Sequence, residues 1–185
     1  MMPYLLAIAL FFLPAYVANT TPPLANRFNI LNSLYKPIDN NKTINGMPIL
    51  GTHKSWRGLV LEIIFCTVLT GAMFILNKQF GWGIYESLGF AYEKINGFVF
   101  GLIFGVGIVF GDLLFAFIKR RLRLRPGFPF IPFDQINYVI GAFIFTEPIA
   151  HLGIKFWIIL AGITLIIHIV FNRLGYNMGL HKAKW

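Results

Sequence analysis

The sequence predicts an all-α integral membrane protein with about five transmembrane helices. Of its 185 residues, 57% are apolar and only 12% are charged, and the mean hydropathy is +0.68. A soluble domain usually carries about 25% charged residues. Apolar runs that approach the roughly 20 residues needed to cross a bilayer recur along the chain. We therefore expect one membrane domain, residues 1–185, with little room for a separate soluble domain.

Five apolar segments are the candidate spans, at residues 4–18, 59–76, 97–118, 135–150 and 154–171. The first segment has the length of a signal peptide but no Lys or Arg at its start, so we expect it to be kept as a helix. The third segment has small residues four apart, which permit close helix packing or border a substrate groove. These residues are Gly97, Gly101, Gly105, Gly107 and Gly111.

The Lys and Arg residues are distributed unequally between the connections. If all five segments cross the membrane, the loops 19–58 and 119–133 and the tail from residue 172 share one side. Thirteen of the 16 Lys and Arg lie there, and only Lys78, Lys94 and Lys155 lie on the other side. The positive-inside rule then places the two loops and the C-terminus in the cytoplasm, and the N-terminus outside. Nucleic acid is not an expected partner, because no soluble fold presents this charge.

Two aspartates border the basic loop 119–133 and form the centre of the predicted site. Asp112 lies near the end of the third segment, and Asp134 opens the fourth. A carboxylate at such a position is costly unless it is paired, hydrated or bound to a cation. A salt bridge from Asp112 to Arg120 or another basic neighbour is one interpretation. We prefer a Mg²⁺ site shared by both aspartates, because Mg²⁺ binds one or two carboxylates together with substrate phosphates.

Basic residues near the aspartates are candidates for phosphate binding. Lys119, Arg120 and Arg121 follow Asp112 by about two helical turns, and guanidinium groups match phosphate oxygens bidentately. The loop 19–58 adds Lys54 and Arg57, which would share a helix face if the second span has already begun there. Interaction of these cations with anionic headgroups is the simpler alternative.

Three further polar residues lie in or near the loop 19–58 and are candidates for the same region. Asn19 and Asp39 can add oxygen ligands, and Asn19 is included among the candidate substrate-binding residues. Glu62 lies about one turn inside the second span. We expect it to pair locally with Arg57 rather than to reach the metal.

Taken in order, these residues resemble the CDP-archaeol synthase family, whose members are membrane cytidylyltransferases distantly related to phosphatidate cytidylyltransferases. The resemblance covers most of the chain and rests on several short motifs in a common order. They are Pro14-Ala15-Tyr16-Val17-Ala18-Asn19, Lys36-Pro37-Ile38-Asp39, Ile49-Leu50-Gly51, Lys54-Ser55-Trp56-Arg57-Gly58, Gly111-Asp112, Phe117-Ile118-Lys119-Arg120-Arg121, and Pro132 with Asp134-Gln135.

The resemblance implies transfer of a cytidylyl group from CTP to a glycerol-phosphate lipid, with release of pyrophosphate. It implies catalytic or metal-binding roles for Asp112, Asp134 and Lys119, and phosphate-binding roles for a second set. That set is Lys54, Arg57, Arg120 and Arg121. The chemistry agrees, because phosphoryl-type transfer depends chiefly on positioning and charge neutralisation.

This chain departs from the family pattern at three places. Asn137 replaces the last aspartate of Asp-Gln-x-Asp, so that position offers a metal ion a carbonyl oxygen without a charge. Thr52-His53 replaces a more typical Asp-Gly, and Ala116 stands where a serine is common. These changes are expected to affect the number of metal ions, the activity or the choice of substrate.

Other functions fit the residues less well. An acid-phosphatase-type site needs Lys-x6-Arg-Pro, whereas Lys119 to Arg125-Pro126 is one residue too short, and no serine precedes Gly-His. A CDP-alcohol phosphotransferase needs an Asp-Gly dipeptide, which the chain lacks. A small transporter or a scaffold for anionic lipid would account for the cations but not for Asp112 and Asp134.

Overall fold

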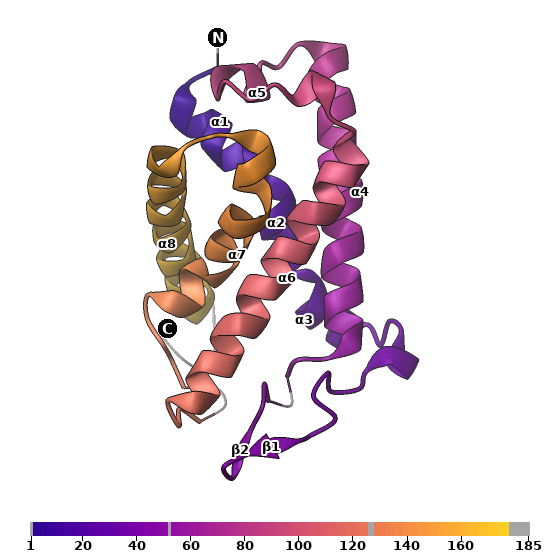
Figure 1. Cartoon of the computed structure of the whole chain (residues 1–185), viewed down its shortest axis with the longest axis vertical. Coiled ribbons are helices and arrows are strands. Elements are labelled where there is room, and N and C mark those ends of the chain that lie inside the picture. Colours follow the sequence, from indigo (N-terminus) through magenta and orange to yellow (C-terminus); the bar gives the residue numbers. More distant parts are fainter. Residues whose placement is uncertain (1, 52, 126–127, 178–185) are drawn as a thin grey trace.

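A computed structural model describes residues 2–51, 53–125 and 128–177. The described part of the chain is mostly helical with very little sheet, and its long helices run side by side in a bundle (Figure 1). The N-terminus lies at one end of the bundle, near the short helix α5 (Ile84–Ser87). The small hairpin β1–β2 (Thr43–Ile44 and Met47–Pro48) lies at the other, which we call the loop end.

The first predicted span is longer than expected and is broken into three helices. They are α1 (Tyr4–Phe11), α2 (Leu13–Asn19) and α3 (Thr21–Arg27). Prolines occupy the first turns of α2 and α3, where a missing N–H is tolerated because those donors have no partner within the helix. The segment Tyr4–Arg27 is long and apolar enough to cross a membrane. The non-helical part of the connection therefore begins after Arg27 rather than at Asn19.

Three other helices have the length and composition of membrane spans. They are α4 (Trp56–Phe80), α6 (Gly97–Arg121) and α8 (Ile154–Asn177). In α8, the part that is long and apolar enough to cross a membrane is Ile154–Leu174. The remaining predicted span forms α7 (Phe133–Ala150), and it is not among the four spans found by length and hydropathy in the described residues. The reason is its polar content: Asp134, Asn137 and Glu147 lie within 18 residues. The prediction of about five membrane helices is therefore approximate.

Helix α6 is central, since it packs along both α4 and α7. Its glycines make this possible, as the spacing predicted. A Cβ at Gly101 would lie 2.8 Å from the backbone oxygen of Thr67 in α4, and a Cβ at Gly111 would overlap the backbone oxygen of Asn137 in α7. The backbones of the two helix pairs therefore touch, and Asp112 is held directly beside the first turns of α7.

A large aromatic cluster of the apolar core lies at the end of the bundle opposite the loop end. Phe11 makes ring contacts with a group of aromatic side chains from α5, α6, α8 and the segment between α5 and α6. The group includes Tyr85, Phe90, Phe100 and Phe156, all of them buried. The predicted site residues lie at the loop end, where polar side chains replace these rings.

Candidate functional site

The loop before α4 brings Lys54 to Asp112. Ser55 is the N-cap of α4, and its Oγ accepts a hydrogen bond from the backbone N–H of Gly58. Lys54 therefore precedes the helix, and its Nζ lies 2.6 and 2.5 Å from the two carboxylate oxygens of Asp112 in α6. The salt-bridge interpretation of Asp112 is correct in kind, but the partner is Lys54 from another segment rather than Arg120.

Asp39 fixes the shape of the loop that carries Lys54. Its carboxylate accepts hydrogen bonds from the backbone N–H groups of Asn41, Leu50 and Gly51 at 2.9–3.2 Å. Burial by itself raises the pKa of Asp39, but these hydrogen bonds outweigh it and hold the pKa below its ordinary value. The N–H of Ile38 bonds the carbonyl oxygen of Lys54 at 2.9 Å, so the two sides of the loop are joined.

A second ion pair joins the end of α6 to the start of α7. The Nζ of Lys119 lies 2.9 and 2.8 Å from the carboxylate oxygens of Asp134. Asp134 also accepts the backbone N–H of Phe130 at 2.9 Å. The Nδ2 of Asn137 approaches a carboxylate oxygen of Asp112 at 3.4 Å. Asp112, Asp134 and Asn137 line the same pocket, so both aspartates belong to one polar cluster.

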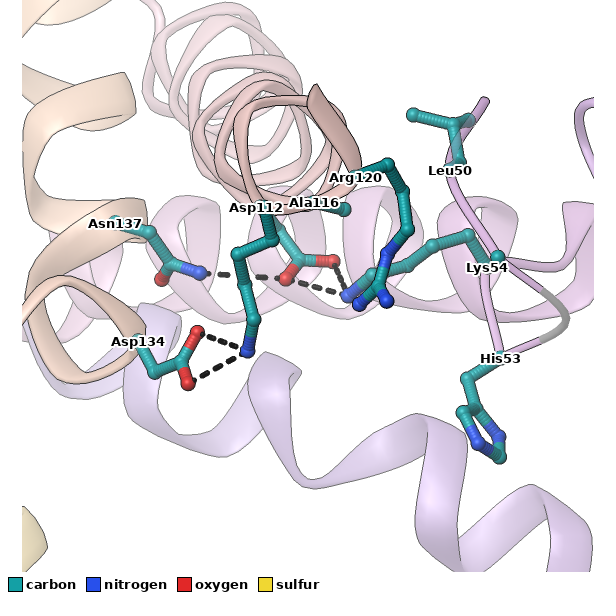
Figure 2. A pocket seen from close by; sticks show the side chains of 10 residues that line it. Leu50, His53, Lys54, Asp112, Ala116, Arg120, Asp134 and Asn137 are labelled. Carbon is teal, nitrogen blue, oxygen red and sulfur yellow. Dashed lines mark hydrogen bonds and ion pairs between the residues drawn. The ribbon is translucent and has the colours of Figure 1, made fainter. Parts of the chain in front are cut away.

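This cluster lines a cavity of about 150 Å³ at the loop end, which we call the first cavity (Figure 2). Its charged lining consists of two carboxylates and three cations, with His53 beside them. These are Asp112, Asp134, Lys54, Lys119 and Arg120. The lining thus carries one net positive charge, which suits a polyphosphate that brings its own cation.

Arg120 is buried in this lining and is only partly satisfied. One of its guanidinium N–H groups bonds the backbone oxygen of Leu124, while its Nε has no hydrogen-bond partner among the described residues. A Cβ on Gly51 would lie 3.9 Å from this Nε, so the glycine of the loop lies close to the guanidinium. A buried donor without a partner is unusual in a folded protein, and here it borders the cavity.

A second cavity, of about 200 Å³, lies on the other side of the Lys54–Asp112 pair. It shares His53, Lys54 and Asp112 with the first cavity, and it adds Asn19 and Glu62. Its other walls are largely apolar and come from α3, α4 and α6. They include Pro22, Pro23, Leu59, Val109 and Leu113.

Two predicted phosphate-binding residues lie outside both cavity linings. Arg57 is buried and bonds the side chains of Asn26 and Asn32 and the backbone oxygen of Ile30, and it lies 4.2 Å from the ring centre of Tyr35. Lys54 and Arg57 do not share a helix face, because α4 begins only after Ser55 and Lys54 therefore lies outside the helix. The expected local pair between Glu62 and Arg57 does not form either.

Arg121 is engaged at the surface of the hairpin. Its guanidinium bonds the backbone oxygens of Ile44, Met47 and Pro48. Arg121 thus ties the end of α6 to the hairpin β1–β2. Its neighbour Arg120 lines the first cavity instead. Asn19, predicted to help bind substrate, lines the second cavity rather than the first.

Two acidic residues have larger roles in the structure than their sequence context predicts. Asp39 organises the Lys54 loop, a role that an aspartate followed by Asn-Asn could have suggested because such segments form side-chain turns. Glu62 lines the second cavity, and a carboxylate inside an apolar run is itself a signal of function.

The carboxylates of the cluster fit a hard divalent cation, because Asp112 and Asp134 are ligand types that Mg²⁺ prefers. The amide oxygen of Asn137 accepts the backbone N–H of Tyr138 at 2.6 Å while its Nδ2 faces Asp112, so the amide would have to turn to offer its oxygen to a cation. Among the described residues, no group of three or more His, Cys, Asp or Glu side chains is arranged to hold a metal by itself. A cation here would therefore depend on one or two carboxylates with neutral oxygens, water and substrate, which is the usual pattern for Mg²⁺.

The family is decided by comparison along the whole chain. The family model described as CarS-like, CDP-archaeol synthase, matches residues 1–185. The chain belongs to this family. The resemblance inferred from the short motifs is thereby confirmed, and it extends over the helices as well as the loops.

Curated relatives show the same similarity at about one third identity. The CDP-archaeol synthase of Methanococcus aeolicus is 33% identical over 181 residues, covering 95% of this chain and 94% of the relative. That of Pyrococcus horikoshii is 32% identical over 176 residues, with 95% and 94% covered. That of Methanococcoides burtonii is 34% identical over 189 residues, with 94% and 99% covered.

One solved structure has the same fold. It is described as an intramembrane enzyme for archaeal membrane lipid biosynthesis, and it superposes with a TM-score of 0.66 at 21% identity. The match covers 88% of this chain and 90% of that one. The all-α membrane architecture is therefore shared by a membrane protein of known structure.

Proposed function

We propose that this protein is a CTP-dependent lipid-phosphate cytidylyltransferase. It moves CMP from CTP to a glycerol-phosphate lipid, gives a CDP-archaeol-like or CDP-diacylglycerol-like product and releases pyrophosphate. The observation that carries the proposal is the first cavity. Three separate segments of the chain meet there and form one polar site at the end of a membrane bundle. They contribute Lys54, Asp112, Lys119, Arg120 and Asp134, in a chain that belongs to the CDP-archaeol synthase family.

The proposed reaction is a displacement at the α-phosphorus of CTP. A phosphate oxygen of the lipid forms the new P–O bond, and the bond from the α-phosphorus to the bridging oxygen of the β-phosphate breaks. The electron pair leaves with pyrophosphate. Lys54, Lys119 and Arg120 would stabilise the charge that gathers on the leaving group, which is the largest contribution that a protein makes to such a step.

Asp112 and Asp134 would hold Mg²⁺, with Asn137 as a neutral oxygen donor. When bound, Mg²⁺ neutralises phosphate charge and orients the nucleotide. Both aspartates are paired with lysines, so a cation held by the aspartates would require these ammonium groups to turn toward the phosphate oxygens of the substrate. Lys54 and Lys119 thereby serve as counterions of the aspartates before binding and of the substrate after it.

The membrane orientation is part of the proposal. The excess of cations in the connections at the loop end favours a cytoplasmic site, an external N-terminus and a cytoplasmic C-terminus. The partners are then cytoplasmic CTP and a lipid phosphate in the inner leaflet, surrounded by membrane lipid.

Labelled CTP tests the proposal directly. Purified protein in detergent is supplied with CTP labelled at the α-phosphorus, Mg²⁺, and lipid phosphates with either prenyl-ether or acyl-ester tails. We expect label in the lipid fraction and an equal amount of pyrophosphate. No labelled lipid with any of these acceptors, together with no Mg²⁺-dependent CTP binding, would instead support a non-catalytic transporter or lipid-binding scaffold.

A further inference from the structure

Glu62 is a membrane-helix carboxylate that the proposed reaction does not use. It lies in the second turn of α4, is only 7% exposed and lines the second cavity. No hydrogen bond from a described residue reaches its carboxylate. An ionised group in this position is costly unless a cation or a proton compensates it.

The charged groups around Glu62 do not supply that compensation. Among the residues that the structure describes, Asp112 and Lys54 are the ionic side chains near enough to act on it, and their charges are opposite. Lys54 is already bound to both oxygens of Asp112. Arg57, five residues earlier in α4, is bound to Asn26, Asn32 and Ile30 instead. With Glu62 ionised, the group of Lys54, Asp112 and Glu62 would have one excess negative charge, which either a bound cation or a proton would offset.

We propose that Glu62 and Asp112 together bind a divalent cation in the second cavity. The cavity of about 200 Å³ has room for an ion and several waters, each of which occupies about 30 Å³. Asn19 lines the same cavity and offers a neutral oxygen. Two carboxylates, an amide oxygen and water form a donor set that suits Mg²⁺ or Mn²⁺.

This site gives the chain a second carboxylate beside Asp112, where Asn137 provides none. Asn137 approaches Asp112 from α7, whereas Glu62 faces it from α4 on the side of the second cavity. A cation held there would also offset the repulsion between Glu62 and an anionic substrate. That last consequence rests on the proposed function, but the binding of the cation does not.

Mn²⁺ binding to the purified protein in detergent, with neither CTP nor lipid present, tests the proposal. Free Mn²⁺ is followed by electron paramagnetic resonance during titration. We expect Glu62→Gln to weaken binding by about tenfold or more, as loss of one ligand or its support does. Glu93→Gln, at an exposed carboxylate in the segment between α5 and α6, is the matched control and should bind as the unmodified protein does.

Glu62→Asp separates coordination from charge alone. It keeps the charge but withdraws the oxygens by one methylene, so a ligand role predicts weaker binding. An unchanged Mn²⁺ affinity in Glu62→Asp would overturn the proposal. An unchanged Mn²⁺ affinity in Glu62→Gln would do so as well, and so would the absence of Mn²⁺ binding by the unmodified protein. If Glu62→Gln does not fold, Glu62→Asp decides alone.

The two proposals fail in different ways. If the protein forms labelled lipid but Glu62→Gln does not change its Mn²⁺ binding, the cation site is wrong and the cytidylyltransferase proposal stands. Mn²⁺ binding that depends on Glu62 in a protein that makes no labelled lipid would do the reverse.

Discussion

The carboxylates at the two ends of the bundle differ in what binds them. At the end opposite the loop end, Glu147 accepts the backbone N–H groups of Leu152 and Gly153 and the indole N–H of Trp157. At the loop end, Asp112 is bound by the ammonium of Lys54 and borders two cavities. A carboxylate bound by backbone N–H groups stabilises a turn and stays bound as long as the turn is folded. A carboxylate bound by the flexible side chain of a lysine can exchange that ammonium group for another cation. The difference separates carboxylates that hold the fold from those that can bind ligands.

Glu86 extends the comparison at the end opposite the loop end. It accepts hydrogen bonds from Asn77 at 3.1 and 3.0 Å, and Asn77 in turn accepts the backbone N–H of Ile84. The group joins α4 to α5 and has no cation in it. We therefore expect substitutions there to act on stability and substitutions of Asp112 to act on activity.

The largest effect is expected for Asp112→Asn. Loss of the carboxylate charge should reduce labelled-lipid formation by about 100-fold or more, the range found when a main electrostatic contribution is lost. The thermal unfolding temperature in detergent should stay close to that of the unmodified protein. Glu86→Gln is the control, and we expect it to lower the unfolding temperature while turnover per folded molecule is retained. Full activity in Asp112→Asn would remove this residue from the site.

Gly111→Ala should come next, because it moves the site without touching a charged group. The new Cβ would overlap the backbone oxygen of Asn137, so α7 must shift away from α6. Overpacking of this kind costs about 1–3 kcal/mol of unfolding free energy. We expect a lower unfolding temperature and about tenfold less activity.

Gly162→Ala is the matched control for that change. Outside the adjacent part of α8 itself, no atom of the described residues lies within 4 Å of the position of its Cβ, so the same substitution should be nearly neutral there. Equal behaviour of the two variants would show that contact between α6 and α7 does not position Asp112.

A smaller effect, in the opposite direction, is expected for Asn137→Asp. Its side chain lies 3.4 Å from Asp112, so a carboxylate there would increase the negative charge around a cation. We expect Mg²⁺ affinity or turnover to rise by several-fold, measured as the Mg²⁺ dependence of labelled-lipid formation. A fall in both would show that this site has adapted to the neutral amide.

The smallest effect concerns Asp39, a loop-end carboxylate held by backbone donors. Its pKa is lowered in the folded protein, so its stabilising contribution is present above the unfolded value of about 3.9 and is lost as the pH falls through the folded value. We expect Asp39→Asn to lower the unfolding temperature at neutral pH, and this difference to shrink below about pH 4. Scans in detergent across this range measure it, and a constant difference would contradict the assignment.

The sequence predicted part of the site because some of its signals are local. Position at the ends of apolar runs predicts Asp112, Asp134, Lys119 and Lys54 as site residues, and the fold brings all four to one cavity. The same signal predicts Arg57 and Arg121, yet both bind backbone oxygens of loops instead. Nothing in the spacing of cations distinguishes a guanidinium that binds substrate from one that binds the chain.

The sequence by itself determined the class of protein, its helical segments and the end of the bundle where its cations gather. These properties are sums over neighbouring residues, and transfer into lipid depends on such sums. Tertiary structure alone decided that Lys54 pairs with Asp112, 58 residues away, and that Glu62 faces a cavity rather than Arg57. Such pairings depend on the path of a long loop and on glycine contacts between helices, which hydropathy and residue spacing do not specify.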